Sequence, residues 1–200
     1  MSTESPRIYL ASQSPRRREL LHQIGVEIAE VLRDLAVDET AHSGETPEVY
    51  VRRVAQAKAE AGWEALLVRG VAALPVLAAD TTVTIDGCIL GKPADREQAA
   101  AMLRRLAGRE HVVLSAVALK DAQHFEMVVS TSTVRFAALD EARIQAYLRT
   151  GEFEDKAGAY GIQGHAGMFV EHLNGSYSGV MGLPLFETAE LLRKLGFSLP

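Results

Sequence analysis

The chain has 200 residues, of which 48% are hydrophobic and 24% are charged, so it holds enough apolar side chain for a folded core. Its formal net charge of -5 argues against a nucleic-acid surface, although a local basic pocket in an acidic protein can still bind phosphate. No uncharged apolar run reaches the roughly 18 residues of a membrane span. The composition therefore indicates a protein that binds neither nucleic acid nor a membrane.

Cys88 is the single cysteine, which excludes an internal disulfide and favours the cytoplasm. It lies in an apolar strand pattern, where a buried and unreactive thiol is expected. Residues 1–7 are polar and lack the apolar stretch of a signal peptide, so we expect a flexible N-terminus there. We expect residues 1–200 to form a single domain, because no repeat or clear linker interrupts the chain.

A strand, a polar loop and a helix open the predicted fold. Residues 8–11 form an apolar run that predicts a short buried strand. Ser14 is a typical N-cap residue and Pro15 suits the first position of a helix, so we predict a helix from there to Gly25. Similar signals predict later helices over residues 46–67, 95–108, 140–150 and 184–196.

The strand signals indicate a sheet with mixed strand directions. Residues 76–79 form a continuous apolar run, typical of a central strand covered on both faces, and we expect this strand to end at Asp80. Asp86 and Gly87 lie between β-rich runs and predict a hairpin, because both turn positions need positive φ. Further strands are predicted over residues 111–119, 125–136 and 168–173. The fold class is therefore α/β.

Three arginines, residues 16–18, follow Ser14 at the predicted start of the first helix. A helix N-terminus has unpaired N–H groups and partial positive charge, so cations there are unfavourable unless an anion lies nearby. Arginine side chains match phosphate oxygens, which makes a phosphate chain the natural candidate. A solvated basic turn paired with Glu19 is the alternative.

Asp80 directly follows the predicted central strand, where α/β folds place their chemistry. A carboxylate there can hold a metal ion, take a proton from water, or do both. The alternative is a carboxylate that hydrogen-bonds to a turn.

Lys92 lies in Gly91-Lys92-Pro93, just after the predicted hairpin. The segment is not a P-loop, because the spacing from Gly87 to Gly91 is one residue short and Pro93 replaces the hydroxyl residue. Lys92 can still reach a phosphate as a point charge. An exposed turn lysine is the alternative.

A glycine-rich segment, residues 152–164, has glycines at 158, 161 and 164 that would let the backbone approach a ligand closely. Gln163 offers an amide donor and acceptor, which suits the edge of a base. The alternative is a flexible surface loop, but long loops in compact domains are often functional.

Taken together, these segments resemble the Maf family of nucleotide pyrophosphatases. The matches occur in the family's order and extend over about residues 8–197; they are residues 10–21 (LASQSPRRRELL), 79–83 (ADTTV), 90–93 (LGKP), 154–164 (EDKAGAYGIQG) and 175–178 (GSYS). The resemblance implies a two-lobed, ITPase-like α/β fold in which helices flank a long twisted mixed sheet and a cleft lies between the lobes.

The resemblance also implies hydrolysis of a nucleoside triphosphate to the monophosphate and pyrophosphate, aided by Mg²⁺ or Mn²⁺. Asp80 would be the proton acceptor, and the specificity positions would be Arg16, Thr81 and Gln163. We expect the phosphates to be bound by Ser14, Arg17, Lys58 and Lys92, and the metal by Asp80 and Glu39.

The form of the 154–164 segment resembles the branch of the family that acts on dTTP and UTP. One departure is Gly179, where the family pattern has Asn, followed by Met181. A pyrophosphatase of different base specificity and a non-catalytic nucleotide-binding regulator of cell division are the alternatives. Asp80 and Glu39 favour the enzyme, since binding alone does not need them. The sequence is compatible with a homodimer.

Overall fold

The computed structural model describes residues 7–71 and 74–199. The predicted flexible N-terminus lies outside the described residues except for Arg7, which begins the first strand. The strands are β1 (Arg7–Ala11), β2 (Glu27–Val31), β3 (Val76–Ile85), β4 (Cys88–Leu90), β5 (Glu110–Lys120), β6 (Phe125–Phe136) and β7 (Val170–Asn174). The helices are α1 (Pro15–Gln23), α2 (Pro47–Val68), α3 (Arg96–Leu106), α4 (Glu141–Leu148), α5 (Tyr177–Met181) and α6 (Leu185–Lys194), with two short 3-10 helices, η1 (Ala157–Ala159) and η2 (His165–Phe169).

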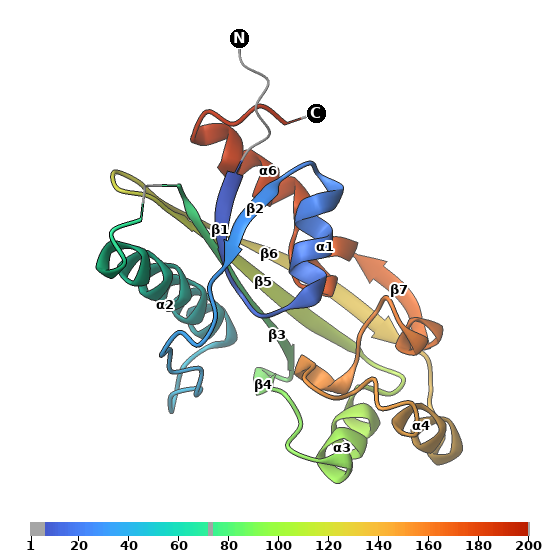
Figure 1. Ribbon diagram of the computed structural model, residues 1–200. Coiled ribbons are helices and arrows are strands. Elements are labelled where there is room, and N and C mark those ends of the chain that lie inside the picture. The colour runs from blue at the N-terminus through green and yellow to red at the C-terminus, as the bar shows by residue number, and fades with distance from the viewer. Residues whose placement is uncertain (1–6, 72–73, 200) are drawn as a thin grey trace.

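The strands form one seven-stranded sheet with the order β2-β1-β3-β5-β6-β7, while β4 pairs with β3 (Figure 1). β1 pairs in parallel with both β2 and β3, and the other pairs are antiparallel. The predicted mixed sheet is therefore confirmed. None of the described helices is long and apolar enough to cross a membrane.

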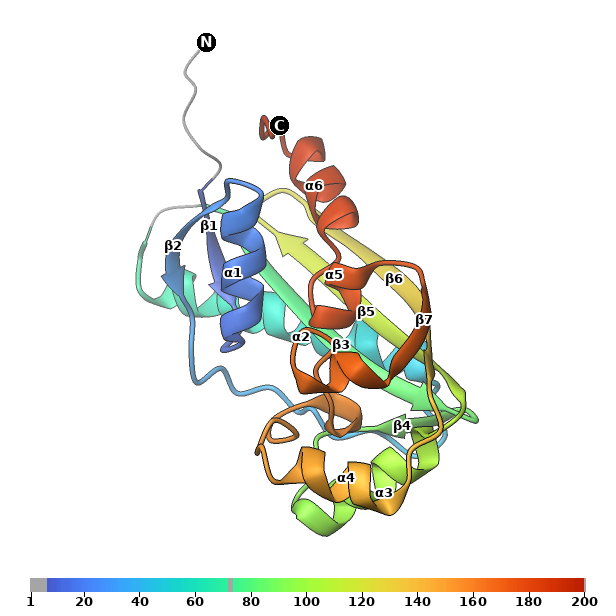
Figure 2. The same cartoon turned by 90° about the vertical axis from the view of Figure 1, so that its right-hand side faces the viewer.

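Helices cover both faces of the sheet. α2 packs on one face, where Val51 and Ala55 meet Val76 and Ala78 of β3. α1 and α6 lie on the opposite face, and Figure 2 shows α2 behind the sheet in that view. Besides the hydrophobic cores on these two faces, a third core is formed by α3, α4 and the two 3-10 helices at the far end of β3. The sheet therefore connects two helix-covered ends of the molecule.

The helix ends follow from local sequence. Thr46, Asp95 and Asp140 each accept a hydrogen bond from a backbone N–H in the first turn of α2, α3 and α4. The Asp86-Gly87 turn has positive φ at both residues, as the hairpin prediction requires. The sequence was sufficient to predict these helix starts and this turn, because caps and tight turns depend on residues that are neighbours in sequence.

The prediction that the central strand ends at Asp80 is wrong, because β3 continues to Ile85. One edge of β3 pairs with β5 without interruption from Val76 to Thr84, so the strand continues past Asp80. On the other edge, β1 pairs with residues 76–78 and β4 with residues 83–85. Residues 79–82 therefore have no partner strand on that edge among the described residues, and we call them the unpaired stretch of β3.

Three further features differ from the sequence predictions or were missed. Cys88 is exposed rather than buried, because it lies in a three-residue strand directly after the hairpin turn. β2 and α5 were not predicted; each has five residues, too few for a clear periodic pattern.

Candidate active site

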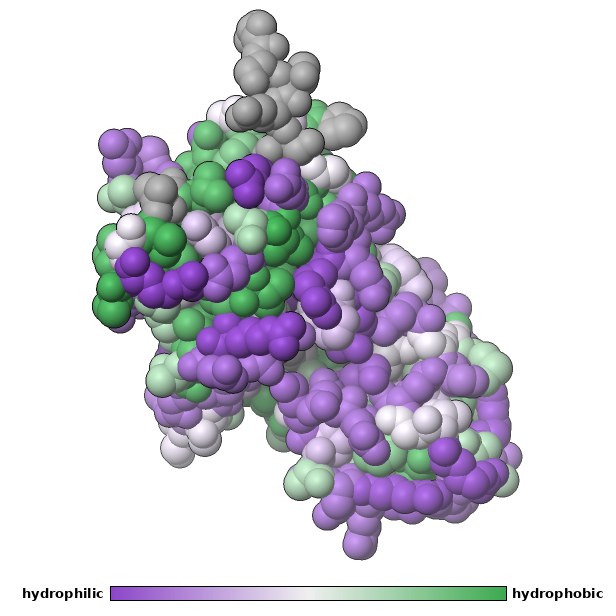
Figure 3. All heavy atoms as spheres, in the orientation of Figure 1, coloured by the Kyte–Doolittle hydropathy of each residue, from purple (hydrophilic) through white to green (hydrophobic). Residues whose placement is uncertain are grey.

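One cavity of about 800 Å³ lies beside the unpaired stretch of β3. It is bordered on one side by the start of α1 and the loop before α2, and on the other by the residues around η1. Figure 3 shows hydrophilic side chains on both sides of the hollow between the two ends of the molecule. The predicted site residues all line this cavity: Ser14, Arg16, Arg17, Glu39, Lys58, Asp80, Thr81, Lys92 and Gln163.

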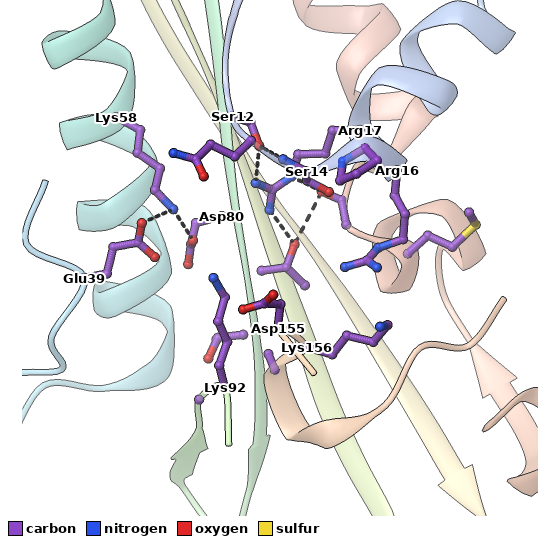
Figure 4. A pocket seen from close by; sticks show the side chains of 18 of the residues that line it. Ser12, Ser14, Arg16, Arg17, Glu39, Lys58, Asp80, Lys92, Asp155 and Lys156 are labelled. Atoms are coloured by element: carbon purple, nitrogen blue, oxygen red, sulfur yellow. Dashed lines mark hydrogen bonds and ion pairs between the residues drawn. The ribbon is translucent and has the colours of Figure 1, made fainter. Parts of the chain in front are cut away.

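Asp80 is on the face of β3 that α2 covers, because side chains alternate along a strand and Ala78 belongs to the core beneath α2. Lys58 of α2 places its Nζ 2.9 Å from Asp80 Oδ1 and 3.0 Å from Glu39 Oε1 (Figure 4). Burial raises the pKa of Asp80, while the charges of Lys58 and Arg17 act in the opposite direction. A carboxylate with a raised pKa is a stronger base than an ordinary aspartate.

Glu39 lies in the loop before α2, and α2 itself holds this loop in place. Arg53 donates from Nη1 to the Asp38 carbonyl at 3.0 Å and from Nη2 to the Thr40 carbonyl at 2.8 Å. The Tyr50 hydroxyl donates to the Glu39 carbonyl at 3.0 Å. The backbone is therefore fixed on both sides of Glu39, which directs its carboxylate toward Lys58.

Asp80 and Glu39 converge on one cation, the ammonium of Lys58. In the part of the chain that the structure describes, no group of three or more His, Cys, Asp or Glu side chains converges on a metal position. Mg²⁺ prefers oxygen ligands and commonly takes one or two carboxylates together with phosphate oxygens. This pair of carboxylates therefore fits Mg²⁺ or Mn²⁺ that is shared with a bound phosphate.

Ser14 occupies the N-cap position of α1, as predicted, and its side chain accepts no hydrogen bond from the helix. Its backbone N–H donates to the Ser12 hydroxyl at 3.3 Å, and its side chain lines the cavity together with Arg16. Unpaired N–H groups in a first turn favour an anion. The start of α1 therefore faces the cavity, and its binding of a phosphate stays a prediction.

Arg17 is buried and joins three segments of the chain. Its Nε donates to the Gly182 carbonyl at 2.8 Å and its Nη1 to the Ser12 hydroxyl at 2.9 Å. Its Nη2 donates to the Thr81 hydroxyl at 3.3 Å. Burial lowers the pKa of Arg17, and the charge of Asp80 opposes this. Because a guanidinium has five N–H donors, at most two remain for a phosphate.

Thr81 points to the opposite face of β3 from Asp80 and belongs to a chain of hydrogen bonds. Its hydroxyl lies 2.9 Å from the hydroxyl of Ser115 on β5, which donates to the Gly179 carbonyl at 2.6 Å. Thr81 therefore donates to Ser115 and accepts from Arg17. Any contact of this hydroxyl with a base has to compete with these two bonds. Ser115 was missed; its signal is a polar residue within an apolar strand.

Gly179 and Met181, the departures from the family pattern, lie in α5. A Cβ at Gly179 would lie 3.0 Å from Ser176 Cβ and 3.4 Å from Pro184 Cβ, so the packing favours glycine. Met181 lines the cavity. Of the two positions, Met181 therefore adds its side chain to the cavity surface, whereas Gly179 contributes its carbonyl to the hydrogen bonds around Thr81.

The glycine-rich segment contains η1 and leads directly into η2, so it is not a flexible surface loop. Gly158 has a φ of 68°, and a Cβ there would lie 3.0 Å from Val83 Cγ1, so the position requires glycine. Tyr160 is buried, and its hydroxyl lies 2.8 Å from Nε2 of the buried His111. Gln163, near the end of the segment, is exposed and lines the cavity.

Lys92 follows β4 and extends into the cavity, where Figure 4 also shows Asp155 and Lys156. The Gly158 N–H donates to the Gly91 carbonyl at 3.1 Å, which attaches the residue before Lys92 to the glycine-rich segment. Lys156 and Tyr50 also line the cavity and were not predicted as site residues. The matching motif contained Lys156, but its spacing alone gave no role.

A mixed sheet whose central strand is left unpaired beside a cavity, lined by arginine, lysine and carboxylate side chains, defines an α/β protein that binds a phosphorylated ligand. The comparison with protein families agrees with this class: the model described as "Maf-like protein" matches residues 7–195. The chain belongs to the Maf-like family.

Several curated relatives are similar over nearly their whole length. A dTTP/UTP pyrophosphatase of Dechloromonas aromatica is 53% identical over 197 residues, covering 96% of this chain and 98% of the relative. One of Burkholderia pseudomallei is 57% identical over 196 residues, covering 94% and 93%. One of Chromobacterium violaceum is 50% identical and covers 100% of both chains. Among solved structures, the Staphylococcus aureus Ham1 protein aligns with a TM-score of 0.47 and 18% identity, over 66% of this chain and 72% of that chain.

Proposed function

We propose that this chain is a nucleoside triphosphate pyrophosphatase that hydrolyses dTTP and UTP to the monophosphate and pyrophosphate. Relatives that are 50–57% identical over nearly the whole chain carry that name. The observation that carries the proposal is the buried Asp80 carboxylate, which lies with Lys58 and Glu39 in a cavity lined by further cations. With a single cysteine, the chain suits a reducing compartment, and we place the activity in the cytoplasm.

Glu39 and Asp80 would hold Mg²⁺ or Mn²⁺ together with phosphate oxygens of the substrate. When bound, such an ion polarises a phosphoryl oxygen and offsets negative charge. The Lys58 ammonium bridges the two carboxylates, so its positive charge would lie beside the phosphates of a bound substrate. Arg53 and Tyr50 keep Glu39 in position throughout.

Asp80 accepts a proton from the water that attacks the α-phosphorus. The bond between the α-phosphorus and the oxygen that bridges to the β-phosphorus breaks, and pyrophosphate leaves. Ser14 and the first-turn N–H groups of α1 bind phosphate oxygens, and Lys58 and Lys92 offset the charge on the leaving group. Arg17 contributes mainly by fixing α1 against β3, since most of its donors are used within the protein.

The test replaces Asp80 with Asn and measures release of pyrophosphate from UTP in the presence of Mg²⁺. Removing a general base costs about 100-fold or more, so we expect a loss of at least that size. Asp155→Asn is the matched control, since it removes a carboxylate that lines the same cavity and Asn tolerates the positive φ of this position. The control should keep most of its activity.

Near-normal turnover by the Asp80→Asn variant would remove Asp80 from the role of base. Release of orthophosphate instead of pyrophosphate would contradict cleavage between the α and β phosphorus atoms. Tight binding of UTP with no product at all would favour the non-catalytic regulator.

A further inference from the structure

The cavity has a second cationic end. Figure 4 shows Arg16 and Lys156 on one side of the cavity, apart from Glu39 and Lys58 on the other. The side with Glu39 and Lys58 contains the carboxylates that suit a metal and a phosphate chain. The base of a nucleotide bound there would lie toward Lys156 and its neighbours.

The side chains of Lys156 and Gln163 both approach Gly161. A Cβ at Gly161 would lie 3.0 Å from Lys156 Cε and 3.1 Å from Lys156 Cδ. The same Cβ would lie 3.2 Å from Gln163 Nε2. Both side chains therefore occupy the space that a larger residue at position 161 would need. The absence of a side chain at Gly161 lets both the lysine and the amide approach this position.

Lys156 has hydrogen-bond donors to offer a ligand. Its Nζ donates to the Glu154 carbonyl at 3.3 Å, which is long for an N–H···O bond, and an ammonium has three donors. The side chain is half-buried, and burial lowers the pKa of Lys156, with the positive charge of Arg16 acting in the same direction. An ammonium in this position is stabilised by an acceptor that the ligand brings.

The edge of uracil or thymine is an acceptor, a donor and an acceptor in sequence: O2, the N3 N–H and O4. One amide group has one acceptor oxygen and one NH₂ donor, so Gln163 can satisfy two adjacent positions of that edge. The third position, a carbonyl oxygen, needs a separate donor. Cytosine carries an amino group in place of O4. A protein donor placed to face O4 would therefore face another donor in cytosine, and both donors would be left without an acceptor.

We infer that Lys156 determines base specificity: its ammonium donates to the O4 carbonyl of uracil or thymine, beside Gln163, and disfavours the amino group of cytosine. The inference rests on the proposed function, since it requires a pyrimidine nucleotide in this cavity. Lys156→Met tests it, because methionine keeps an apolar stem over Gly161 and removes the charge.

The measurement is calorimetric binding of three probes in the presence of Mg²⁺: the α,β-methylene analogues of UTP and CTP, and inorganic tripolyphosphate. The unmodified chain should prefer the UTP analogue. Lys156→Met should lose about 10- to 100-fold of that preference, the size of one charge-assisted hydrogen bond, and bind tripolyphosphate as before. Lys92→Met is the contrasting variant, which should weaken all three probes by similar factors.

Three results would overturn the inference. The first is a preference for the UTP analogue that persists in Lys156→Met. The second is the absence of that preference from the unmodified chain. The third is weakened tripolyphosphate binding in Lys156→Met, which would make Lys156 a phosphate ligand. Because these probes need no turnover, the proposed hydrolysis is tested separately: a chain that prefers the UTP analogue but releases no pyrophosphate from UTP refutes the hydrolysis alone.

Discussion

His111 and Tyr160 form a buried polar pair that fixes the glycine-rich segment to β5. The two side chains are joined by a hydrogen bond and pack edge-to-face against each other and against Phe136. Nδ1 of His111 is buried and has no hydrogen-bond partner. Burial therefore lowers the pKa of His111 to about 4, since the charged ring would lose its hydration here.

This pair makes the stability of the protein depend on pH. An unfolded histidine has a pKa of about 6.5, so below that pH the unfolded chain binds a proton that folded His111 does not. The contribution of neutral His111 to the free energy of unfolding is thus fully present above about pH 6.5. It falls as the pH decreases toward 4, with a loss of about 2 kcal/mol between pH 7 and pH 5. Urea unfolding of His111→Gln should lack this loss.

The comparison isolates His111 because the carboxylates titrate alike in both proteins. His172→Gln provides the control, since His172 is an exposed histidine on β7. That variant should keep the pH dependence of the unmodified chain. If His111→Gln and the unmodified chain lost equal stability between the two pH values, the histidine would not be the cause.

At the scale of elements, the site depends on how α2 holds the loop that contains Glu39. Arg53→Gln removes the donors to the Asp38 and Thr40 carbonyls and leaves the carboxylate of Glu39 unchanged. In the proposed function Glu39 holds the metal, and residues that orient a metal ligand typically contribute about 10- to 100-fold to metal affinity, so the KM for Mg²⁺ should rise by about tenfold or more. The kcat at saturating Mg²⁺ should change little.

Arg52→Gln is the matched control, because Arg52 is the adjacent residue of α2 and pairs with Glu48 on the surface. Steady-state kinetics with varied Mg²⁺ should separate the two variants. An equal KM for Mg²⁺ in both would show that the loop before α2 holds its position without Arg53.

The elements show what the sequence could and could not predict. Caps such as Asp95 and Asp140, and the Asp86-Gly87 turn, are local, so their elements were predicted well. The end of β3 was mispredicted because its continuation through Asp80 is set by pairing with β5, about 35 residues further along the chain. The family motifs pointed to residues that the structure places around one cavity, whereas spacing alone could not reveal that Lys156 and Gln163 both approach Gly161.

At the scale of the whole molecule, four segments distant in sequence surround the cavity. They are the start of α1, the loop before α2, the residues after β4 and the glycine-rich segment. Figure 2 shows that they come from both ends of the sheet. A ligand that bridges them stabilises all four together, because each contributes contacts to the bound state.

Amide hydrogen exchange measures this stabilisation of the four segments directly. Addition of the α,β-methylene analogue of UTP with Mg²⁺ should slow amide exchange in all four segments at the same ligand concentration. The turn between β5 and β6, residues 121–124, does not line the cavity and should exchange at an unchanged rate. Protection of one segment alone would contradict a ligand that spans both ends.

The unpaired stretch of β3 has a consequence for how substrate choice can diverge. Asp80 and Thr81 are neighbours in the chain, yet they point to opposite faces of the sheet and still line one cavity, because no strand closes that edge between them. The proposed base, Asp80, thus lies under α2, while Thr81, a position that the family resemblance links to specificity, lies one peptide away on the α1 side. Under these proposed roles, mutations on the α1 side would change which nucleotide is accepted and leave the cluster of Asp80, Lys58 and Glu39 under α2 unchanged.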